Sequence, residues 1–497
     1  MLPTTWIALV LGFWSTLYLL DAFLKTKKPW SRNYLSFLEK TGLSVSICQC
    51  RWYSNFFNRT FLRIGQWKPN ILRLWFTVGA FFGLVAMLMS VAILTLLIVN
   101  TFRQQPVEQQ VLTPVMPGIN LPTSQIWYYL LTLLVCGILH EVGHAIAAVR
   151  EQVKVNGFGL FLFVLYPGAY VDLSSEHLNA VSPLRQLRIY CAGVWHNFII
   201  VIGAIIMLLF LPFILMPFYS TGQAVVITSV LEGSPVSGPR GLAVGEPLTS
   251  ISGCSVTNQD EWFGCISYSI KERSLGHCMP TGLIHQLNTN PIKTNLTENK
   301  NLIDCCNVTS DTHLCFSYNT KSSPNTNYYE YNKKFACLPA RTTTDRPVCK
   351  LQSDCYAPKL ELVCAYPLVD NQTKLLRINH GRKPPLLFLG HPLDLHYSVM
   401  VSNYVPNNSY VPIHLPYMVE TFCKYLISLS GALVILNVVP CYALDGQFIC
   451  HAFIELMFKS TVPDREMRGL IFTLIILYGT CLLGLNVVMA MWTLFFA

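Results

Sequence analysis

His140, Glu141 and His144 form an HEVGH motif within an otherwise apolar stretch of the chain. A spacing of four residues places the two histidines on one face of a helix, one turn apart, where both imidazoles can bind a single Zn²⁺ ion. Glu141 can then act as the general base toward a water molecule at the metal. The alternative, two core histidines and a buried glutamate, would leave three polar groups without partners in hydrocarbon. The motif therefore predicts a catalytic site with one zinc ion.

A catalytic zinc ion needs a third protein ligand and one open position. Asp445 is the outstanding candidate in the other apolar segments, because it lies at the end of a predicted membrane span and follows Pro440. Proline ends the helix and Gly446 permits unusual backbone angles, so Asp445 can be carried into the site on irregular backbone. The alternative is a solvated aspartate in a turn at the membrane boundary. Together with HEVGH, the pattern favours His140, His144 and Asp445 as the zinc ligands.

The composition indicates that these residues lie in a membrane. Of the 497 residues, 52% are hydrophobic and only 12% are charged, which is too apolar for an ordinary soluble enzyme. We therefore expect a polytopic α-helical protein in a lipid bilayer. A net charge of +9 could indicate nucleic acid binding, but ten Lys and Arg residues lie between Lys25 and Arg73, as in the cytosolic flank of a membrane span. No direct nucleic acid binding is expected.

Six apolar runs are long enough to cross about 30 Å of hydrocarbon. They cover Trp6–Phe23, Trp75–Thr101, Ile126–Val149, Leu187–Phe218, Phe422–Val439 and Leu470–Phe496. The first lacks a basic amino-terminal region and a clear cleavage site, which predicts a retained span rather than a signal peptide. A shorter run, Phe158–Val171, predicts either a re-entrant hairpin or an interfacial loop. Another, Phe448–Phe458, predicts a half-helix or a bent continuation of the preceding span.

Between Tyr219 and about Glu420 the composition becomes polar, and ten of the eighteen cysteines fall from Cys254 to Cys364. Because no C-x-x-C spacing occurs among them, disulfides are favoured over a metal site, although the pairing does not follow from the sequence. Clustered cysteines and N-glycosylation sequons are both typical of an oxidising lumen. The predicted glycosylation sites are Asn295, Asn307, Asn371 and Asn407.

These features divide the chain into four parts. Residues 1–74 hold the first span and a basic cytosolic segment, 75–218 the membrane core with HEVGH, 219–420 a lumenal domain, and 421–497 the membrane core with Asp445 and the last span. If the cysteine-rich domain is lumenal, the basic residues Arg150 and Lys154 place the end of the HEVGH span in the cytosol. The zinc site is therefore predicted toward the cytosolic side of the membrane.

The two motifs and their order resemble the site-2 protease family of intramembrane zinc metalloproteases. The resemblance rests on HEVGH, on the N-x-x-P-x-x-x-L-D-G motif from Asn437 to Gly446, on the long cysteine-rich insertion, and on the segment from Ala192 to Asn197. It implies the same three zinc ligands and Glu141 as the general base. It also implies substrates that are single-span, membrane-anchored transcription factors of the sterol regulatory element-binding and unfolded-protein-response types, first cut in the lumen by another protease. The implied location is the Golgi and endoplasmic reticulum.

Further positions are predicted to lie beside the ligands or the substrate. Asn197 could line the cavity and hydrogen-bond a zinc ligand or the substrate backbone, with plain helix packing as the alternative. Asn437 and Pro440 belong to the second motif, and they too are predicted to lie beside the zinc ligands or the substrate. His196 is expected to pack or to form a hydrogen bond locally.

Residues 225–256 contain stretches in which apolar residues alternate along the chain, separated by turns that contain glycine. This stretch looks like part of a PDZ fold, which the family often carries, although the pattern also fits other small β domains. The cysteine-rich stretch interrupts it, and no carboxylate-binding loop is evident. The fold prediction is thus a polytopic α-helical membrane protein with a lumenal PDZ-like β domain that carries a cysteine-rich, disulfide-containing insertion.

Two other functions remain open from the sequence. A membrane metalloprotease of the prenylated-protein type would typically use a glutamate as its third ligand, and Asp445 argues against it. A transporter or receptor with a structural zinc ion would lead us to expect repeated halves with broken helices, which the sequence does not show.

Overall fold

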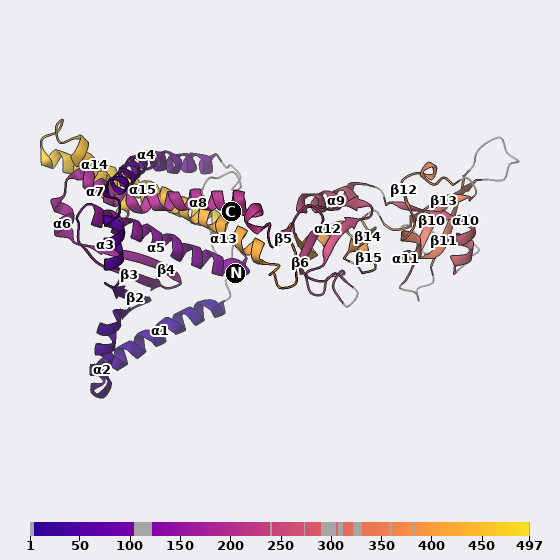
Figure 1. The fold of residues 1–497 in the computed structure, drawn as a ribbon, viewed down its shortest axis with the longest axis horizontal. Helices are drawn as coiled ribbons and strands as arrows, with labels where there is room; N and C mark the ends of the chain where they lie inside the picture. Colours follow the sequence, from indigo (N-terminus) through magenta and orange to yellow (C-terminus); the bar gives the residue numbers. More distant parts are fainter. Residues whose placement is uncertain are drawn as a thin grey trace. The chain divides into compact units, whose positions relative to one another are not determined.

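The structure is a computed structural model that describes residues 4–103, 122–238, 241–272, 274–289, 305–306, 312–321, 331–357, 360–370, 372–381 and 383–496. The chain forms two compact units (Figure 1). One unit comprises Met1–Leu211 with Val419–Ala497 and is mainly helical, and the other, Pro212–Met418, is built on β-sheets. His140 and Asp445 belong to the same unit, although 305 residues separate them in the sequence.

Long helices form most of the first unit, because its apolar runs satisfy their backbone hydrogen bonds internally. Its helices are α1 (Thr4–Thr26), α2 (Lys28–Thr41), α3 (Asn58–Gln66), α4 (Pro69–Phe102), α5 (Ile126–Arg150), α6 (Ser175–Ala180), α7 (Pro183–Tyr190), α8 (Ala192–Leu215), α13 (Leu415–Asn437), α14 (Asp445–Met457) and α15 (Arg465–Phe496). HEVGH lies on α5, and Asp445 is the first residue of α14.

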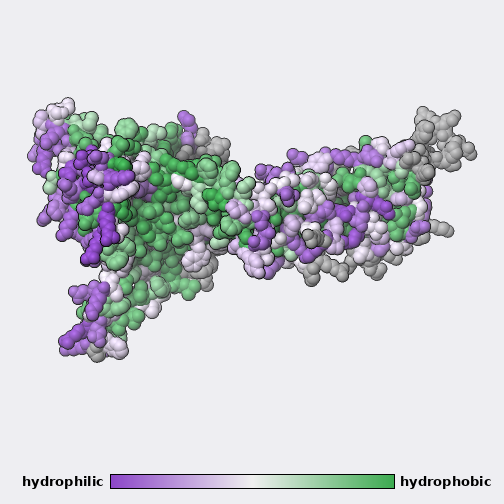
Figure 2. Space-filling view, viewed as in Figure 1, coloured by the Kyte–Doolittle hydropathy of each residue, from purple (hydrophilic) through white to green (hydrophobic). Residues whose placement is uncertain are grey.

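Within the described residues, six helical segments are long and apolar enough to cross a membrane, and each overlaps one of the predicted runs. They are Ala8–Thr26, Pro69–Phe102, Thr123–Arg150, Pro183–Leu215, Leu415–Asn437 and Arg465–Trp492. Figure 2 shows apolar side chains over the sides of the helical unit. Exposed residues such as Phe81, Leu88 and Leu209 are suited to contact lipid. The unit thus has the surface of a multi-pass membrane protein.

The structure differs from the prediction for one apolar segment and decides between the two alternatives for another. The run Leu187–Phe218 is not one helix, because α7 and α8 meet at a turn at Cys191. The run Phe448–Phe458 lies in α14 except for Phe458, which follows the last residue of that helix, and α14 is a separate helix, as the half-helix alternative predicted, rather than a bent continuation of α13. Both breaks bear on the site, because they leave backbone groups near the motifs free to contact side chains.

A four-stranded antiparallel sheet lies in the first unit, in the order β1-β2-β3-β4. Its strands are β1 (Leu43–Ser46), β2 (Gln49–Ser54), β3 (Val155–Phe163) and β4 (Tyr166–Leu173). The segment Phe158–Val171 is therefore an antiparallel β-hairpin, in which Phe158 lies opposite Val171. β4 is an outer strand and packs against α5. One edge of the sheet consequently meets the HEVGH helix.

The chain turns tightly between α13 and α14. A Cβ atom at Gly446 would lie 1.9 Å from the carbonyl oxygen of Val439, and one at Gly479 of α15 would lie 2.1 Å from that of Pro440. Only glycine permits these close backbone approaches. They fix the start of α14 against the end of α13 and against α15.

The second unit contains a six-stranded sheet in the order β15-β14-β7-β6-β16, with β8 paired to β7. Its strands are β6 (Val225–Val230), β7 (Pro247–Ile251), β8 (Cys254–Ser255), β14 (Lys374–His380), β15 (Leu386–Gly390) and β16 (Val399–Ser402). Helices α9 (Gln259–Lys271) and α12 (Pro392–Ser398) pack together beside it, and Trp262 is fully buried in this core. Residues 225–256 thus contribute three strands to one sheet. Their likeness to a PDZ domain stays a prediction.

The part of the cysteine-rich stretch from Cys278 to Cys364 interrupts this sheet, since it lies between α9 and β14 and forms a sheet of its own. The order of that sheet is β11-β10-β13-β9-β12. Its strands are β9 (Gly276–Pro280), β10 (His313–Lys321), β11 (Tyr331–Pro339), β12 (Val348–Cys349) and β13 (Leu362–Pro367), with helices α10 (Thr281–Leu287) and α11 (Ala340–Thr344). A short pair, β5 (Tyr219–Ser220) with β17 (Val405–Pro406), completes the unit.

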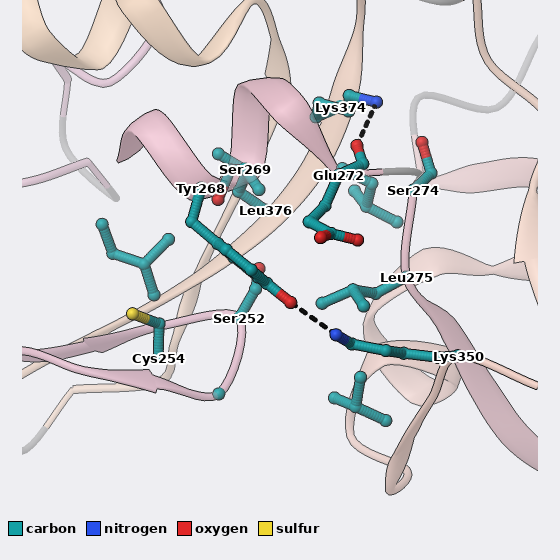
Figure 3. A pocket seen from close by; sticks show the side chains of 14 residues that line it. Ser252, Cys254, Tyr268, Ser269, Glu272, Ser274, Leu275, Lys350, Lys374 and Leu376 are labelled. Atoms are coloured by element: carbon teal, nitrogen blue, oxygen red, sulfur yellow. Dashed lines mark hydrogen bonds between the residues drawn. The ribbon is translucent and has the colours of Figure 1, made fainter. Parts of the chain in front are cut away.

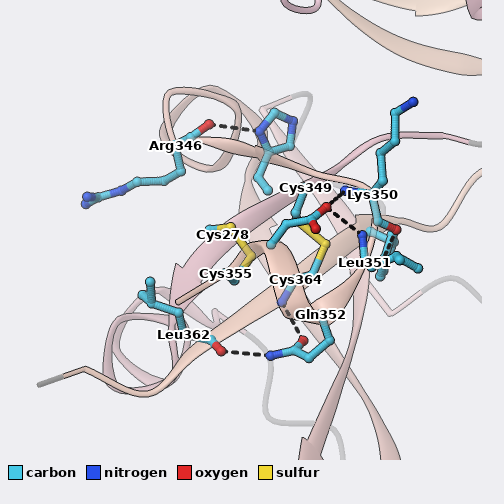
Figure 4. Close-up of a disulfide and its surroundings, with 12 residues drawn as sticks. Cys278, Arg346, Cys349, Lys350, Leu351, Gln352, Cys355, Leu362 and Cys364 are labelled. Atoms are coloured by element: carbon cyan, nitrogen blue, oxygen red, sulfur yellow. Dashed lines mark hydrogen bonds between the residues drawn. A yellow bond between two sulfur atoms is a disulfide. The ribbon is translucent and has the colours of Figure 1, made fainter. Parts of the chain in front are cut away.

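All ten cysteines from Cys254 to Cys364 form disulfides, as the sequence predicted. The pairs are Cys254–Cys265, Cys278–Cys355, Cys305–Cys315, Cys306–Cys337 and Cys349–Cys364. Figure 4 shows Cys278–Cys355 beside Cys349–Cys364. Of the predicted glycosylation sites, Asn407 is exposed, whereas Asn295, Asn307 and Asn371 lie outside the described residues.

Candidate metal centre

His140, His144 and Asp445 bring three potential ligand atoms together. The Nε2 atoms of the two histidines are 3.1 Å apart. Oδ2 of Asp445 lies 2.9 Å from Nε2 of His140 and 3.3 Å from Nε2 of His144. A tetrahedral zinc ion with bonds of about 2.0 Å requires ligand atoms about 3.3 Å apart. The three atoms are close to that spacing, and both imidazoles are buried.

The other ring nitrogen of His144 has a partner that fixes the tautomer. Nδ1 of His144 is 2.8 Å from the carbonyl oxygen of Ile189, which lies in the last turn of α7. Because a carbonyl oxygen can only accept, Nδ1 carries the proton. Nε2 therefore keeps its lone pair, directed toward His140 and Asp445, as a metal ligand must.

Asn197 contacts Nδ1 of His140, as the Ile189 carbonyl contacts Nδ1 of His144. The amide nitrogen of Asn197 lies 3.2 Å from Nδ1 of His140, while its buried Oδ1 has no partner among the described residues. Rotating the amide by half a turn exchanges these two atoms, so that Oδ1 accepts a hydrogen bond from the Nδ1–H of His140. We assign this orientation, because it satisfies the buried oxygen and leaves Nε2 of His140 free for a metal ion. The donor set thus fits zinc.

Glu141 lies between the histidines in sequence and contacts the sheet. Its Oε2 accepts a hydrogen bond of 3.0 Å from the backbone N–H of Val171 on β4. That N–H is therefore directed away from β3 and toward α5. Glu141, the candidate general base, therefore lies at the edge of β4 that is not paired with β3.

Gly193 allows α8 to approach the two imidazoles. A Cβ atom at Gly193 would lie 2.4 Å from Nε2 of His144 and 2.6 Å from Nε2 of His140. Any side chain at this position would occupy the space at the ligand atoms.

We expect Gly193→Ala to lower zinc affinity by at least about tenfold, because the new methyl group displaces the ligand nitrogens. Gly203→Ala is the matched control, since Gly203 lies on the same helix and a Cβ there meets no described atom within 4 Å. Zinc affinity is measured by competition with a chelator. Equal affinity of the two variants would contradict this account of the centre.

Asp445 differs from its predicted setting in one respect. It is the first residue of α14, whereas irregular backbone was expected to carry it; the irregular segment instead ends just before it. Pro440 is buried in that segment. Asn437 ends α13 and is half-buried, and in the described part of the chain its side chain makes no hydrogen bond to the ligand residues. The roles assigned to Asn437 and Pro440 stay predictions.

His196 makes local contacts, as expected. Its Nδ1 is 2.7 Å from the carbonyl oxygen of Ala192, and its ring packs near Trp75 and Phe76.

Cys136 lies one turn before His140 and is not among the site residues predicted from the sequence. Its Sγ is 2.9 Å from Oγ of Ser430 on α13, and both residues are fully buried. This contact joins α5 to the helix that leads toward Asp445. The four-residue spacing from His140 to Cys136 was the available signal, because it places both residues on one face of α5.

Two features of the second unit are separate from this centre. Cys278, Cys349 and Cys355 have sulfur atoms close enough to bind a metal, but all three are in disulfides (Figure 4). A cavity of about 420 Å³ lies beside Tyr268 and Lys350 and includes none of the predicted site residues (Figure 3).

Comparison with known proteins agrees with this chemistry. Residues 128–479, which include both motifs, match the model of a family described as Peptidase family M50. A protein of Arabidopsis thaliana named "Membrane-bound transcription factor site-2 protease homolog" is 24% identical to this chain over an alignment of 491 residues, and the match covers 88% of this chain and 91% of that protein.

Proposed function

Because the chain belongs to peptidase family M50 and is therefore a metalloprotease, we propose that it cleaves a peptide bond within or near the transmembrane helix of single-span membrane proteins. The observation that carries this proposal is the convergence of His140, His144 and Asp445 beside Glu141, on helices with the surface of a membrane protein. One Zn²⁺ ion is the expected cofactor, held by the two Nε2 atoms and a carboxylate oxygen of Asp445.

Zinc, when bound, supplies Lewis-acid chemistry that polarises a carbonyl group and lowers the pKa of water. The protein's own contribution begins with Glu141, which takes a proton from the attacking water and later delivers it to the leaving amine of the cleaved peptide bond. Ile189 and Asn197 keep both imidazoles in the tautomer that leaves Nε2 available. Burial of the site limits access of bulk water.

The substrate must become extended before it can be cut, because a helical peptide bond is shielded by its own hydrogen bonds. β4 is an outer strand, and its Val171 N–H already reaches Glu141. A substrate strand added alongside β4 would therefore bring its backbone to the general base. This arrangement supports strand addition as the mode of substrate binding.

The proposed substrates are membrane-anchored transcription factors of the sterol regulatory element-binding and unfolded-protein-response types. Another protease would first cut them in the lumen. The second cut, made by this chain, would then release the cytosolic part to the nucleus. The name of the Arabidopsis relative supports membrane-bound transcription factors as the substrate class, and the motif resemblance supports the two types. The disulfides of the second unit support a lumenal location for that unit. The motif resemblance supports the Golgi and endoplasmic reticulum as the membranes, and the basic residues Arg150 and Lys154 after the HEVGH span support a metal centre toward the cytosol.

The test is cleavage of a model single-span protein by the purified chain in liposomes. We expect zinc-dependent cleavage inside or at the edge of the substrate's apolar span, with loss of activity on chelation and recovery on zinc addition. Mass spectrometry of the products locates the cut. Cleavage confined to soluble loops, or activity that survives complete removal of metal, would contradict the proposal.

A further inference from the structure

α7 contacts the helices that carry the candidate ligands. The carbonyl oxygen of Ile189, in its last turn, orients His144 of α5. Tyr190 of the same helix stacks on Phe448 of α14, the helix that begins with Asp445. α7 packs against α4, α5 and α14. The placement of α7 therefore bears on both halves of the metal centre.

An ionic cluster around a buried carboxylate joins α7 to the end of α5. Glu151, seven residues after His144, has a side chain that is only 2% exposed. Its Oε2 lies 2.8 Å from Nε of Arg185, and its Oε1 lies 3.1 Å from Nη1 of Arg188. Nη2 of Arg185 also donates to the backbone carbonyl of Glu151, at 2.6 Å. The two arginines are three residues apart and thus lie on one face of α7.

The cluster extends to a third helix. Nε of Arg188 donates a hydrogen bond of 3.0 Å to Oγ1 of Thr77 on α4. Apolar packing alone is non-directional and permits small rotations of a short helix, whereas charge-assisted hydrogen bonds fix direction as well as distance. Arg188 directly precedes Ile189, so a rotation of α7 that breaks the cluster also moves the carbonyl oxygen from His144.

We propose that Glu151 is a positioning residue for the metal centre, which it serves by holding Arg185 and Arg188, and hence the Ile189 carbonyl, in place. This inference rests on the proposed zinc protease function. In the described structure no hydrogen bond of these three side chains reaches a ligand residue, so Glu151 acts through α7 and not by contact with metal or substrate.

The test compares Glu151→Gln with the parent chain in lipid. Glutamine keeps the shape of the side chain but removes the charge that balances the two arginines. We expect zinc affinity to fall about 10- to 100-fold, the range typical for loss of a partner that orients a ligand. The absorption spectrum of the cobalt-substituted chain should also change, because the imidazole of His144 is no longer held. Cleavage should fall mainly through kcat, with KM for the model substrate little changed.

Asp21→Asn is the matched control. Asp21 is also a buried carboxylate in the helical unit, but its partners are Lys25 and Tyr34 on α1 and α2. The parent zinc affinity and cobalt spectrum should be retained in this variant. If Glu151→Gln equals the parent in zinc affinity and cobalt spectrum, or if Asp21→Asn loses as much as Glu151→Gln, the positioning role is overturned.

A second variant decides the question if Glu151→Gln fails to accumulate in the membrane. Arg188→Lys keeps the positive charge but cannot bridge Glu151 and Thr77 in a fixed fork, so a smaller loss of zinc affinity is expected. Parental zinc affinity in Arg188→Lys would then overturn the proposal. A parent chain that neither binds zinc nor cleaves would instead defeat the proposed function, which keeps the two failures distinct.

Discussion

Glu141→Gln should reduce cleavage of a single-span substrate by about 10²- to 10⁴-fold, the contribution typical of a general base. An amide cannot take a proton from water at neutral pH, whereas its size and its hydrogen bond from Val171 can be retained. Because His140, His144 and Asp445 are unchanged, the variant should still bind zinc. The measurement is the initial rate of product formation, with zinc content determined on the same sample.

Glu176→Gln is the control for Glu141→Gln, since Glu176 is an exposed glutamate on α6. It should keep parental activity. A zinc-replete Glu141→Gln protein with near-normal turnover would show that another group acts as the base.

Asp445→Asn should lower both zinc affinity and activity, because a neutral amide is a poor zinc ligand. The fall in affinity should exceed the roughly 10- to 100-fold that loss of an outer hydrogen-bond partner costs. This pattern differs from that of Glu141→Gln, which loses activity and keeps the metal. Chelator competition measures the affinity.

Asp464→Asn serves as the control for Asp445→Asn. Asp464 is exposed in the loop after α14 and accepts a backbone hydrogen bond from Glu466, which an asparagine oxygen can also accept. If Asp445→Asn keeps full zinc occupancy and cleavage, a different residue completes the ligand set.

The sequence predicted the parts of the site that depend on short-range spacing. The four-residue separation of His140 and His144 is enough to place both on one face of α5. Asp445 could be found at long range only because ionisable residues are rare in apolar segments, which leaves few candidates. The structure brings these three residues together, while their roles await the experiments above.

The sequence did not predict the four-stranded sheet. β1 and β2 are short and lie in a basic segment that was assigned only to the cytosol, and β2 pairs with β3 more than a hundred residues later, as in Gln49 opposite Phe163. Such pairing depends on tertiary packing rather than on local preference. For Phe158–Val171 the sequence predicts a re-entrant hairpin or an interfacial loop, but it does not predict that β2 pairs with β3.

Backbone groups and buried charges were also beyond sequence reasoning. The Ile189 carbonyl has no signature in the sequence, because every residue carries one. Glu151 follows Arg150 at the end of a predicted span, where a solvated flank is the ordinary expectation. Its burial results from the way α7 folds back beside α5, with Arg185 and Arg188 on the facing side.

X-ray absorption at the zinc edge of the purified chain in lipid tests the central claim most directly. The arrangement of His140, His144 and Asp445 predicts two imidazole nitrogens and oxygen ligands at about 2.0 to 2.1 Å, with no sulfur at about 2.3 Å. The imidazole signal should fall by one ligand in His144→Ala. Sulfur ligands, or an imidazole count that His144→Ala leaves unchanged, would contradict the proposed centre.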